Sequence, residues 1–168
     1  MDERAAELER LYREVGPILW GYLRRRAADR NIAEELFQET FYLAIRDFAL
    51  LQNAVSERAW IIGIARNLLR RHWRRAISHR AVPLPEDHAA DDRPTGDPRM
   101  DVMRQAVARL PDSQRVVLEL RLAEDLSYAE IAEALAIPVG TVRSRIHNAV
   151  AVLRTRAAEM NSRKIMDR

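Results

Sequence analysis

The segment LSYAEIAEALAIPVGTVRSRIHNAV, residues 126–150, contains two short helical patterns separated by only a few residues. Ser127 and Glu130 have the spacing of a capping box, which predicts the start of a helix over 128–135. Pro138 suits the first turn of a second helix. The connection between the two has the length of the turn in a helix-turn-helix, so the segment predicts that motif within an all-α chain.

The second of these helices, which we expect to end at about residue 159, has an apolar and a polar side. The apolar stripe consists of Val142, Ile146, Ala149 and Leu153. No acid occurs between residues 141 and 156. Arginine can pair with guanine or phosphate, and serine and asparagine with base edges, so the pattern favours a helix that enters the DNA major groove over an ordinary solvated helix. The polar side consists of Thr141, Ser144, Arg145 and Asn148, flanked by Arg143 and His147.

Three longer helical patterns precede this segment, over 7–28, 31–48 and 58–78, and we expect them to share one core. Pro17 interrupts the first pattern, which predicts a kink or a restart of that helix. No strand pattern and no internal repeat occurs, which again favours an all-α fold.

The pattern over 31–48 predicts an N-cap at Asn31, completed by Glu34 three residues later. Its inward face is predicted to be Ala33, Leu36, Phe37, Thr40, Phe41, Ala44, Ile45 and Phe48. An acidic outward face is a poor surface for DNA, so it is either a protein-docking face or a solvated face with acids near a helix N-terminus. That outward face consists of Glu34, Glu35, Gln38 and Glu39.

The pattern over 58–78 places basic residues opposite its apolar ones, and no acid occurs between residues 59 and 80. A run of arginines is usually a solvated face, and a membrane-surface helix is a further alternative. Trp60 and Trp73 favour a strand-binding surface, because a strand taken out of the duplex needs aromatic pockets beside a cationic track. Trp60 itself is expected in the core rather than as a base platform. The basic face consists of Arg66, Asn67, Arg70, Arg71 and Arg74.

Residues 81–98 are rich in proline and acids and almost free of apolar side chains, which predicts a flexible acidic linker. Six acids lie between residues 86 and 101, against two arginines. We therefore expect two small helical domains, over 1–80 and 99–160, followed by a polar tail over 161–168.

The composition excludes several classes of function. The 168 residues include no cysteine, which rules out disulfides, thiolate metal sites and cysteine nucleophiles. The four histidines lack metal-ligand spacing, and no glycine-rich phosphate loop is present. No apolar run approaches a membrane span, and the charged start is not a signal peptide. We therefore expect a cytoplasmic protein that is no enzyme, needs no cofactor or metal and does not insert into a membrane.

Five motifs, in order, resemble those of the bacterial RNA polymerase sigma factors of the extracytoplasmic-function (ECF) type. They are AEELFQETF at 33–41, AWIIGIARNLLRRHWRR at 59–75, the acidic linker, LPDSQRVVLELR at 110–121 and LSYAEIAEALAIPVGTVRSRIHNAVAVLR at 126–154. The resemblance covers about residues 8–157, and the order of motifs is more specific than any one of them.

The resemblance implies a promoter-specificity subunit that binds the clamp helices and flap of core polymerase and initiates transcription, as in a stress or envelope response. It implies an anti-sigma partner, and a linker whose acids mimic nucleic acid in polymerase channels. Docking is implied for Glu34, Glu35, Gln38 and Glu39. Residues 53–57, with Asn53 and Ser56, are implied as the pocket for a flipped base of the minus-ten element. Recognition and melting of that element are further implied for Trp60, Arg66, Asn67, Arg70, Arg71 and Arg74. Recognition of the minus-thirty-five element is implied for Gly140, Arg143, Ser144, Arg145 and His147, beside Thr141 and Asn148 of the same helix.

The sequence departs from the family pattern at several positions. Glu35 stands where aspartate is common, which should preserve docking, whereas Arg71 stands where aspartate is frequent and alters the polar face of its helix. Ala136 replaces the usual turn glycine, which costs on the order of 1 kcal/mol if that residue is left-handed. Asn148 and Val150 replace arginine or lysine, so we expect fewer phosphate contacts and a shallower salt dependence.

Two other readings remain open on the sequence alone. An autonomous regulator would use only residues 100–159 and would bind duplex DNA alone, as a dimer. A helical adaptor or anti-sigma-type partner would make no DNA contacts. A sigma factor differs from both because it binds promoters tightly only together with core polymerase.

Overall fold

The computed structural model describes residues 3–79 and 98–166, and all regular structure in these ranges is helical. The all-α prediction is therefore confirmed for this part of the chain. The helices fall into two compact units, the first built from α1 to α4 and the second around α5, α6 and α8. The linker predicted over 81–98 lies outside the described residues except for Pro98.

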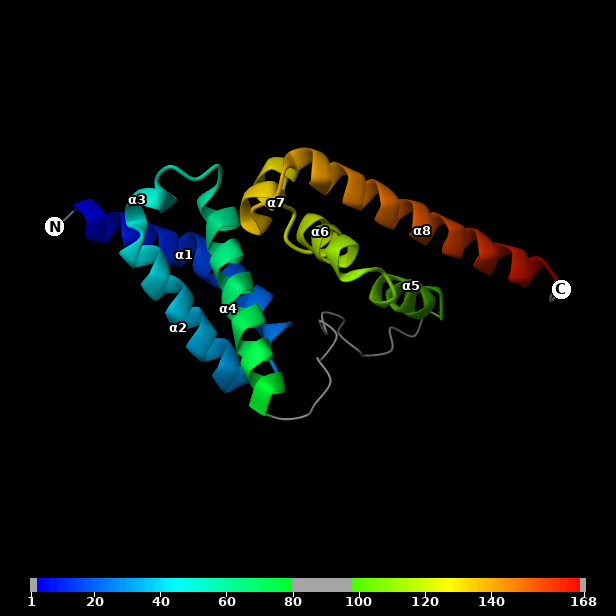
Figure 1. Cartoon of the computed structure of the whole chain (residues 1–168), viewed down its shortest axis with the longest axis horizontal. Helices are drawn as coiled ribbons and strands as arrows, with labels where there is room; N and C mark the ends of the chain where they lie inside the picture. Colours follow the sequence, from blue (N-terminus) through cyan, green and yellow to red (C-terminus); the bar gives the residue numbers. More distant parts are fainter. Residues whose placement is uncertain (1–2, 80–97, 167–168) are drawn as a thin grey trace. The chain divides into compact units, whose positions relative to one another are not determined.

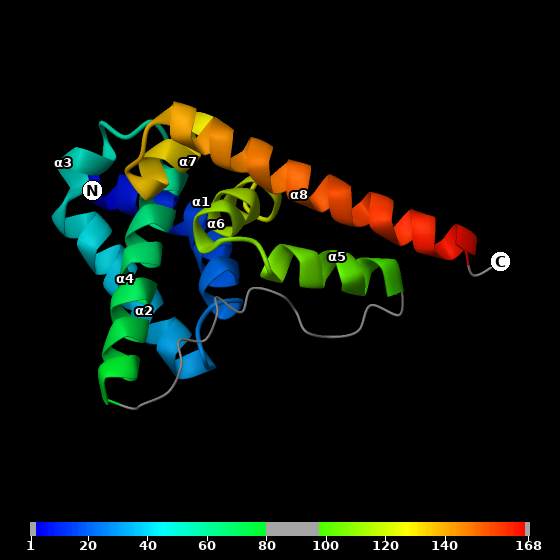
Figure 2. The ribbon, with the colours of Figure 1, turned by 45° about the vertical axis from the view of Figure 1, so that its right-hand side comes forward.

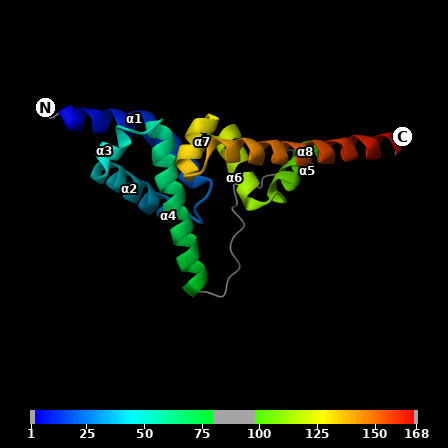
Figure 3. The same cartoon turned by 45° about the horizontal axis from the view of Figure 1, so that its top comes forward.

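The first unit consists of α1 (Glu3–Arg24), α2 (Arg30–Arg46), the short α3 (Phe48–Leu51) and α4 (Glu57–His79). The three long helices contact one another, and α3 follows α2 at its end (Figures 1 and 3). They share one core, as the sequence predicted. Its buried side chains include Leu11, Leu19, Leu23, Leu36, Ala44, Ile61, Ala65 and Leu68.

Pro17 lies inside α1, which continues through it, so the helix does not restart. An interior proline costs about 3 kcal/mol because it removes one backbone hydrogen bond and crowds the preceding turn. Leu19 and Leu23 follow Pro17 and are fully buried. Each contributes about 1.5–3 kcal/mol by burial, so core packing after the proline offsets its cost.

The N-cap of α2 is Asp29, and the prediction of Asn31 is wrong by two residues. The Asp29 carboxylate accepts a hydrogen bond from the Ile32 backbone N–H at 2.9 Å. Aspartate and asparagine are equally good caps, so local preference does not decide between these positions. Glu34 forms an ion pair with Arg30 at 2.7 Å and takes no part in a capping box.

The second unit contains α5 (Pro98–Ala108), α6 (Asp112–Leu122), α8 (Val139–Met166) and the part of α7 (Tyr128–Leu135) up to Ala132. Helix α8 contacts α5 and α6, and it extends beyond α5 (Figure 2). Around Leu110, Leu118 and Ala149 a small core forms, against which Val107, Val150 and Leu153 pack.

The helix-turn-helix geometry predicted for 126–150 is present. The Ser127 backbone N–H donates to Glu130 Oε2 at 2.7 Å, and the Glu130 N–H donates to Ser127 Oγ at 3.3 Å, so the capping box is confirmed. Helix α7 ends in a Schellman motif, in which the Ile137 N–H donates to the Ala132 carbonyl and the Ala136 N–H to that of Glu133. Ala136 is left-handed, with φ of 52°.

Three helix ends differ from the prediction. Pro138 precedes α8, and its carbonyl accepts the Thr141 and Val142 N–H groups, so it is not in the first turn. Pro98, expected in the linker, begins α5, in agreement with the preference of proline for the first helical position. Helix α8 continues to Met166, into the predicted polar tail, because no glycine or proline stops it.

No helix in the described ranges combines the length and the apolar character needed to cross a membrane.

Candidate nucleic-acid interface

The polar face of α4 forms a basic surface. Asn67, Arg70, Arg71 and Arg74 are exposed, whereas Arg66 is half-buried. The exposed four recur at helical spacing on one side of α4, and together with Arg75 and Ser78 they line a groove of about 440 Å³. Four arginines around one groove create a strongly positive surface that suits a phosphate backbone.

Arg71 is not an isolated charge in this groove, because its guanidinium forms an ion pair with Glu39 of α2. Residues 32 positions apart are thus joined across two helices. The structure thus joins one residue that was expected to contact DNA and one that was expected to contact polymerase.

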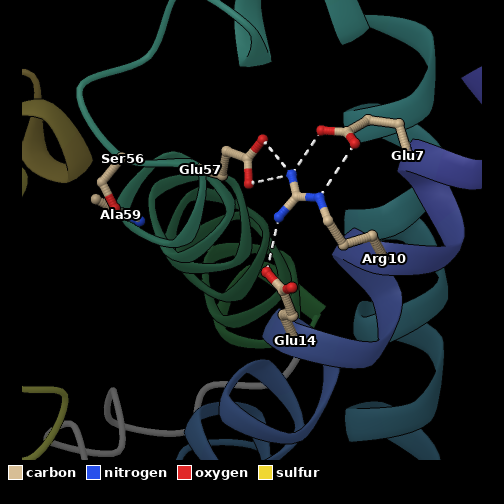
Figure 4. Close-up of polar contacts among 6 residues, drawn as sticks. All are labelled: Glu7, Arg10, Glu14, Ser56, Glu57 and Ala59. Carbon is tan, nitrogen blue, oxygen red and sulfur yellow. Dashed lines mark hydrogen bonds and ion pairs between the residues drawn. The ribbon is translucent and has the colours of Figure 1, made fainter.

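The segment 52–56 connects α3 to α4 and is held at both ends. The Asn53 side-chain amide donates to the Ala49 carbonyl at 2.8 Å. Ser56 is the N-cap of α4, since its hydroxyl accepts the Ala59 N–H at 3.3 Å (Figure 4). Trp60 in the first turn of α4 is half-buried. It is thus neither fully in the core, as expected, nor fully exposed as a base platform would be.

The acidic side of α2 does not form one surface. Glu34 and Gln38 lie beside an apolar groove of about 1080 Å³ between α1 and α2. Glu35 is exposed, and Glu39 is engaged by Arg71. The apolar walls of this groove include Tyr12, Trp20, Phe37, Phe41, Tyr42 and Ile45.

The aromatic rings of this groove contact one another. Tyr12 and Phe41 have ring centroids 4.9 Å apart, and Phe37 and Phe41 are 5.1 Å apart. Tyr12 and Tyr42 nevertheless expose 56% and 64% of their surface. A partly exposed aromatic groove of this kind can accept the apolar side of a partner helix.

Most of the polar face of α8 is exposed, and three of the four residues of the opposite stripe are buried. Val142 and Ala149 are fully buried and Ile146 is 8% exposed. On the polar face Arg145 and Thr141 are half-buried, and the other members are exposed: Gly140, Arg143, Ser144, His147 and Asn148. The Ser144 hydroxyl donates to the Thr141 carbonyl at 3.0 Å.

Sequence reasoning missed part of these surfaces. Ile45 was expected to face inward but is 40% exposed, and Tyr42 was not considered. Leu50 and Val55, on either side of Asn53, expose 62% and 67% of their surface. One signal was available, because the apolar residues of 31–48 occupy more of the helix circumference than a single buried stripe needs.

The described ranges hold no group of three acidic or histidine side chains arranged to bind a metal ion.

Two families match the chain in order along the sequence. Residues 11–77 match "Sigma-70 region 2" and residues 100–153 match "Sigma-70, region 4". Because the first match covers most of α1 to α4, the autonomous regulator that uses only the second unit is not favoured.

Individual relatives match nearly the whole chain. The ECF RNA polymerase sigma factor SigL of Mycobacterium tuberculosis is 32% identical over 162 residues, which cover 93% of this chain and 92% of SigL. The RNA polymerase sigma factor HrpL of Pseudomonas syringae pv. syringae is 28% identical over 154 residues. The aligned region covers 86% of this chain and 84% of HrpL. Sigma factors act in transcription initiation and are not enzymes.

A solved structure has the same fold. The sigma factor RpoE from Bartonella quintana, crystallised in complex with the anti-sigma factor NepR, aligns with a TM-score of 0.66 and 22% identity over 90% of this chain and 97% of RpoE. Together with the identity to SigL across both domains, these matches show that the chain belongs to the ECF sigma factors, which bind core RNA polymerase and promoter DNA and direct transcription initiation.

Proposed function

We propose that α4 and the segment before it recognise and open the minus-ten element of the promoter. The observation that carries this proposal is the groove in which Asn67 is surrounded by arginines. A separated strand needs cations along its backbone and side chains that contact unstacked bases. Arg70 and Arg74 would track phosphates, and Asn67, with two donors and an acceptor, would contact a base edge. Arg66 and Trp60 would support this surface from half-buried positions.

The segment 52–56 would hold the base that leaves the stack. Asn53 and Ser56 offer polar groups there, and the neighbouring Leu50 and Val55 offer apolar surface. Flipped bases are held by this combination of hydrogen bonds to the base edge and contact with its face.

The groove between α1 and α2 would receive a helix of the polymerase clamp. Such a groove binds the apolar face of a partner helix, and Glu34 and Gln38 beside it would contact polar groups of that helix. Glu35 would add an exposed negative charge to this docking surface. Glu39 would act on the surface through its ion pair with Arg71. The second unit would contact the polymerase flap.

Helix α8 would recognise the minus-thirty-five element in the major groove. Arg145 and Ser144 would contact bases, while Arg143, His147 and Asn148 would reach bases or phosphates. Thr141 would lie on the same face of α8. Gly140 has open space where a Cβ would stand, so packing does not require glycine there. Close approach of the DNA backbone would explain it.

In a cell this chain would act in the cytoplasm, together with polymerase, as part of a stress or envelope response. An anti-sigma factor would inhibit it by covering the docking and DNA-binding surfaces, as suggested by the RpoE relative solved with NepR. The chain would supply no catalytic step, cofactor or metal of its own.

Run-off transcription with purified core polymerase over a promoter library tests this assignment. Asn67→Ala should abolish initiation from duplex promoters but leave contacts to the minus-thirty-five element intact, with Asn31→Ala as the control. Arg145→Ala should weaken upstream-element binding by about 1–3 kcal/mol if it contacts a base. Arg154→Ala, at an exposed arginine of α8 outside the proposed DNA-binding residues, should not. Equal loss of upstream binding by Asn67→Ala and Arg145→Ala would contradict the division of roles.

A further inference from the structure

Arg10 of α1 joins three carboxylates, one of which belongs to the start of α4 (Figure 4). Its Nη2 donates to both carboxylate oxygens of Glu57, at 2.9 and 2.8 Å. Nε and Nη2 donate to Glu7 at 3.1 and 2.6 Å, and Nη1 donates to Glu14 at 2.7 Å. All three guanidinium nitrogens are therefore engaged.

Two of these contacts lie within α1, and one does not. Glu7 and Glu14 are one helical turn from Arg10 on either side. Glu57 is 47 residues away in the sequence and is the first residue of α4. The contact to Glu57 thus fixes the start of α4 relative to α1, whereas the other two orient the Arg10 side chain.

The contact between Arg10 and Glu57 matters because Glu57 adjoins the segment 52–56. Glu57 directly follows Ser56, the N-cap of α4 and the last residue of the segment 52–56. At the other end of that segment Leu51 is 2% exposed and therefore anchored in the core. Core packing thus holds one end of the segment, and the N-cap and the Arg10–Glu57 contact are among the interactions that hold the other.

Each guanidinium nitrogen of Arg10 donates to a carboxylate, which leaves at most one Nη1 N–H for any other partner. Hydrogen bonds to Glu7 and then to Glu57 raise the pKa of its guanidinium above the ordinary value, so the charge is held by the carboxylates around it. Three acids around one arginine leave the cluster with a net negative charge, which does not attract phosphate. Any influence of Arg10 on DNA must therefore pass through Glu57 and the backbone.

We infer that Arg10 is a positioning residue for base recognition, which holds the segment 52–56 in the conformation that receives the unstacked minus-ten base. The inference rests on the proposed role of that segment in minus-ten recognition. Lysine cannot replace Arg10, because its single nitrogen does not hold three carboxylates in a planar fork.

The test compares two substitutions that remove the same charge from the same cluster. Glu57→Gln weakens the contact between α1 and α4, and Glu14→Gln weakens only a contact within α1. Holoenzyme made with each variant is assayed by run-off transcription on a template with a pre-opened minus-ten bubble. The bubble carries either the base that the wild-type holoenzyme prefers or a substituted base.

The measured quantity is the ratio of transcripts from the two templates. Glu57→Gln should lower this ratio about fivefold, equivalent to about 1 kcal/mol of discrimination. Arg10→Gln and Arg10→Lys should lower it similarly, and the Arg10→Gln/Glu57→Gln double variant no further, because one contact carries the effect. Glu14→Gln should leave it within about twofold, equivalent to about 0.4 kcal/mol.

Two results would overturn the inference and are distinguishable. If the wild-type holoenzyme discriminates and Glu57→Gln keeps the wild-type ratio, or loses activity equally on both templates, Arg10 is merely structural. If the wild-type holoenzyme does not initiate from either template, the proposed function itself is refuted and the inference with it.

Discussion

Arg71 of α4 and Glu39 of α2 neutralise each other across the two helices that are proposed to bind DNA and polymerase. Both side chains are about half exposed, at 49% and 43%, so water and salt weaken the pair. Its value for stability is therefore modest. Its consequence is functional, because either substitution releases an unpaired charge on the neighbouring surface.

We predict that Arg71 contributes less to single-strand binding than Arg70 does. Arg70→Ala should reduce the salt dependence by about 0.7 in log–log slope, the value of one phosphate contact to a single strand. Arg71→Ala should reduce it less, because Glu39 already compensates that charge. The measurement is holoenzyme affinity for a minus-ten single-stranded oligonucleotide across a series of salt concentrations.

Glu39→Gln provides the complementary test. It should strengthen oligonucleotide binding by releasing Arg71, and this gain should vanish in the Glu39→Gln/Arg71→Ala double variant. An equal loss of slope for Arg70→Ala and Arg71→Ala would show instead that Arg71 leaves Glu39 when DNA binds.

The sequence predicted the start of a helix well where neighbouring residues determine it. Ser127 and Glu130 define the start of α7 because each bonds to the backbone of the other. The start of α2 was missed because aspartate and asparagine are equivalent caps, so local preference does not distinguish Asp29 from Asn31. The end of α8 was missed because nothing in the sequence stops a helix before Met166.

The surfaces were predicted as helix faces, but their partners were not. Periodicity places Glu39 and Arg71 on polar faces and gives no information about which faces meet. Arg10 and Glu57 are likewise remote in sequence, so their contact emerges only when α1 and α4 pack. The apolar groove between α1 and α2 was also missed. Periodicity placed Ile45 and Phe37 on the inward face of the helix, so both were assigned to the core.

Ala136→Gly should stabilise the helix-turn-helix formed by α7 and α8. Ala136 has a φ of 52°, a left-handed conformation that glycine adopts without the steric cost that alanine incurs. We expect a gain of about 1 kcal/mol, seen as slower native-state hydrogen exchange of amides in α6 to α8. Ala151→Gly makes the same chemical change in the exposed interior of α8 and should cost about 1 kcal/mol. Destabilisation by both would mean that Ala136 is not strained.

Glu7→Gln should weaken the dependence of stability on pH in the acid range. The hydrogen bond from Arg10 holds the pKa of the Glu7 carboxyl below its ordinary value of 4.5. The unfolded chain therefore binds more protons than the folded one, so this contribution is fully present above pH 4.5 and is lost as the pH falls through the folded-state pKa.

Urea unfolding of the wild type and Glu7→Gln at several values between about pH 3 and about pH 6 measures this effect. The same comparison in an Arg10→Gln background should show little difference, because the cause of the pKa shift is gone. A wild-type acid slope that persists in Glu7→Gln would assign it to other carboxyls.

Gly140→Ala should change stability and DNA binding in opposite directions. Gly140 lies in the first turn of α8, and a Cβ there would meet no described atom within 4 Å. Alanine should therefore stabilise α8 by up to about 1 kcal/mol by restricting the unfolded chain. If the DNA backbone approaches this position closely, the added methyl group should at the same time weaken binding to the minus-thirty-five element.

Hydrogen exchange of α8 and upstream-element footprinting by the holoenzyme measure the two effects, with Gly21→Ala in α1 as the control that should leave the footprint unchanged. A stabilised α8 with an unchanged footprint would remove Gly140 from the DNA-binding surface, because it would show that the open space beside Gly140 faces solvent and not the promoter.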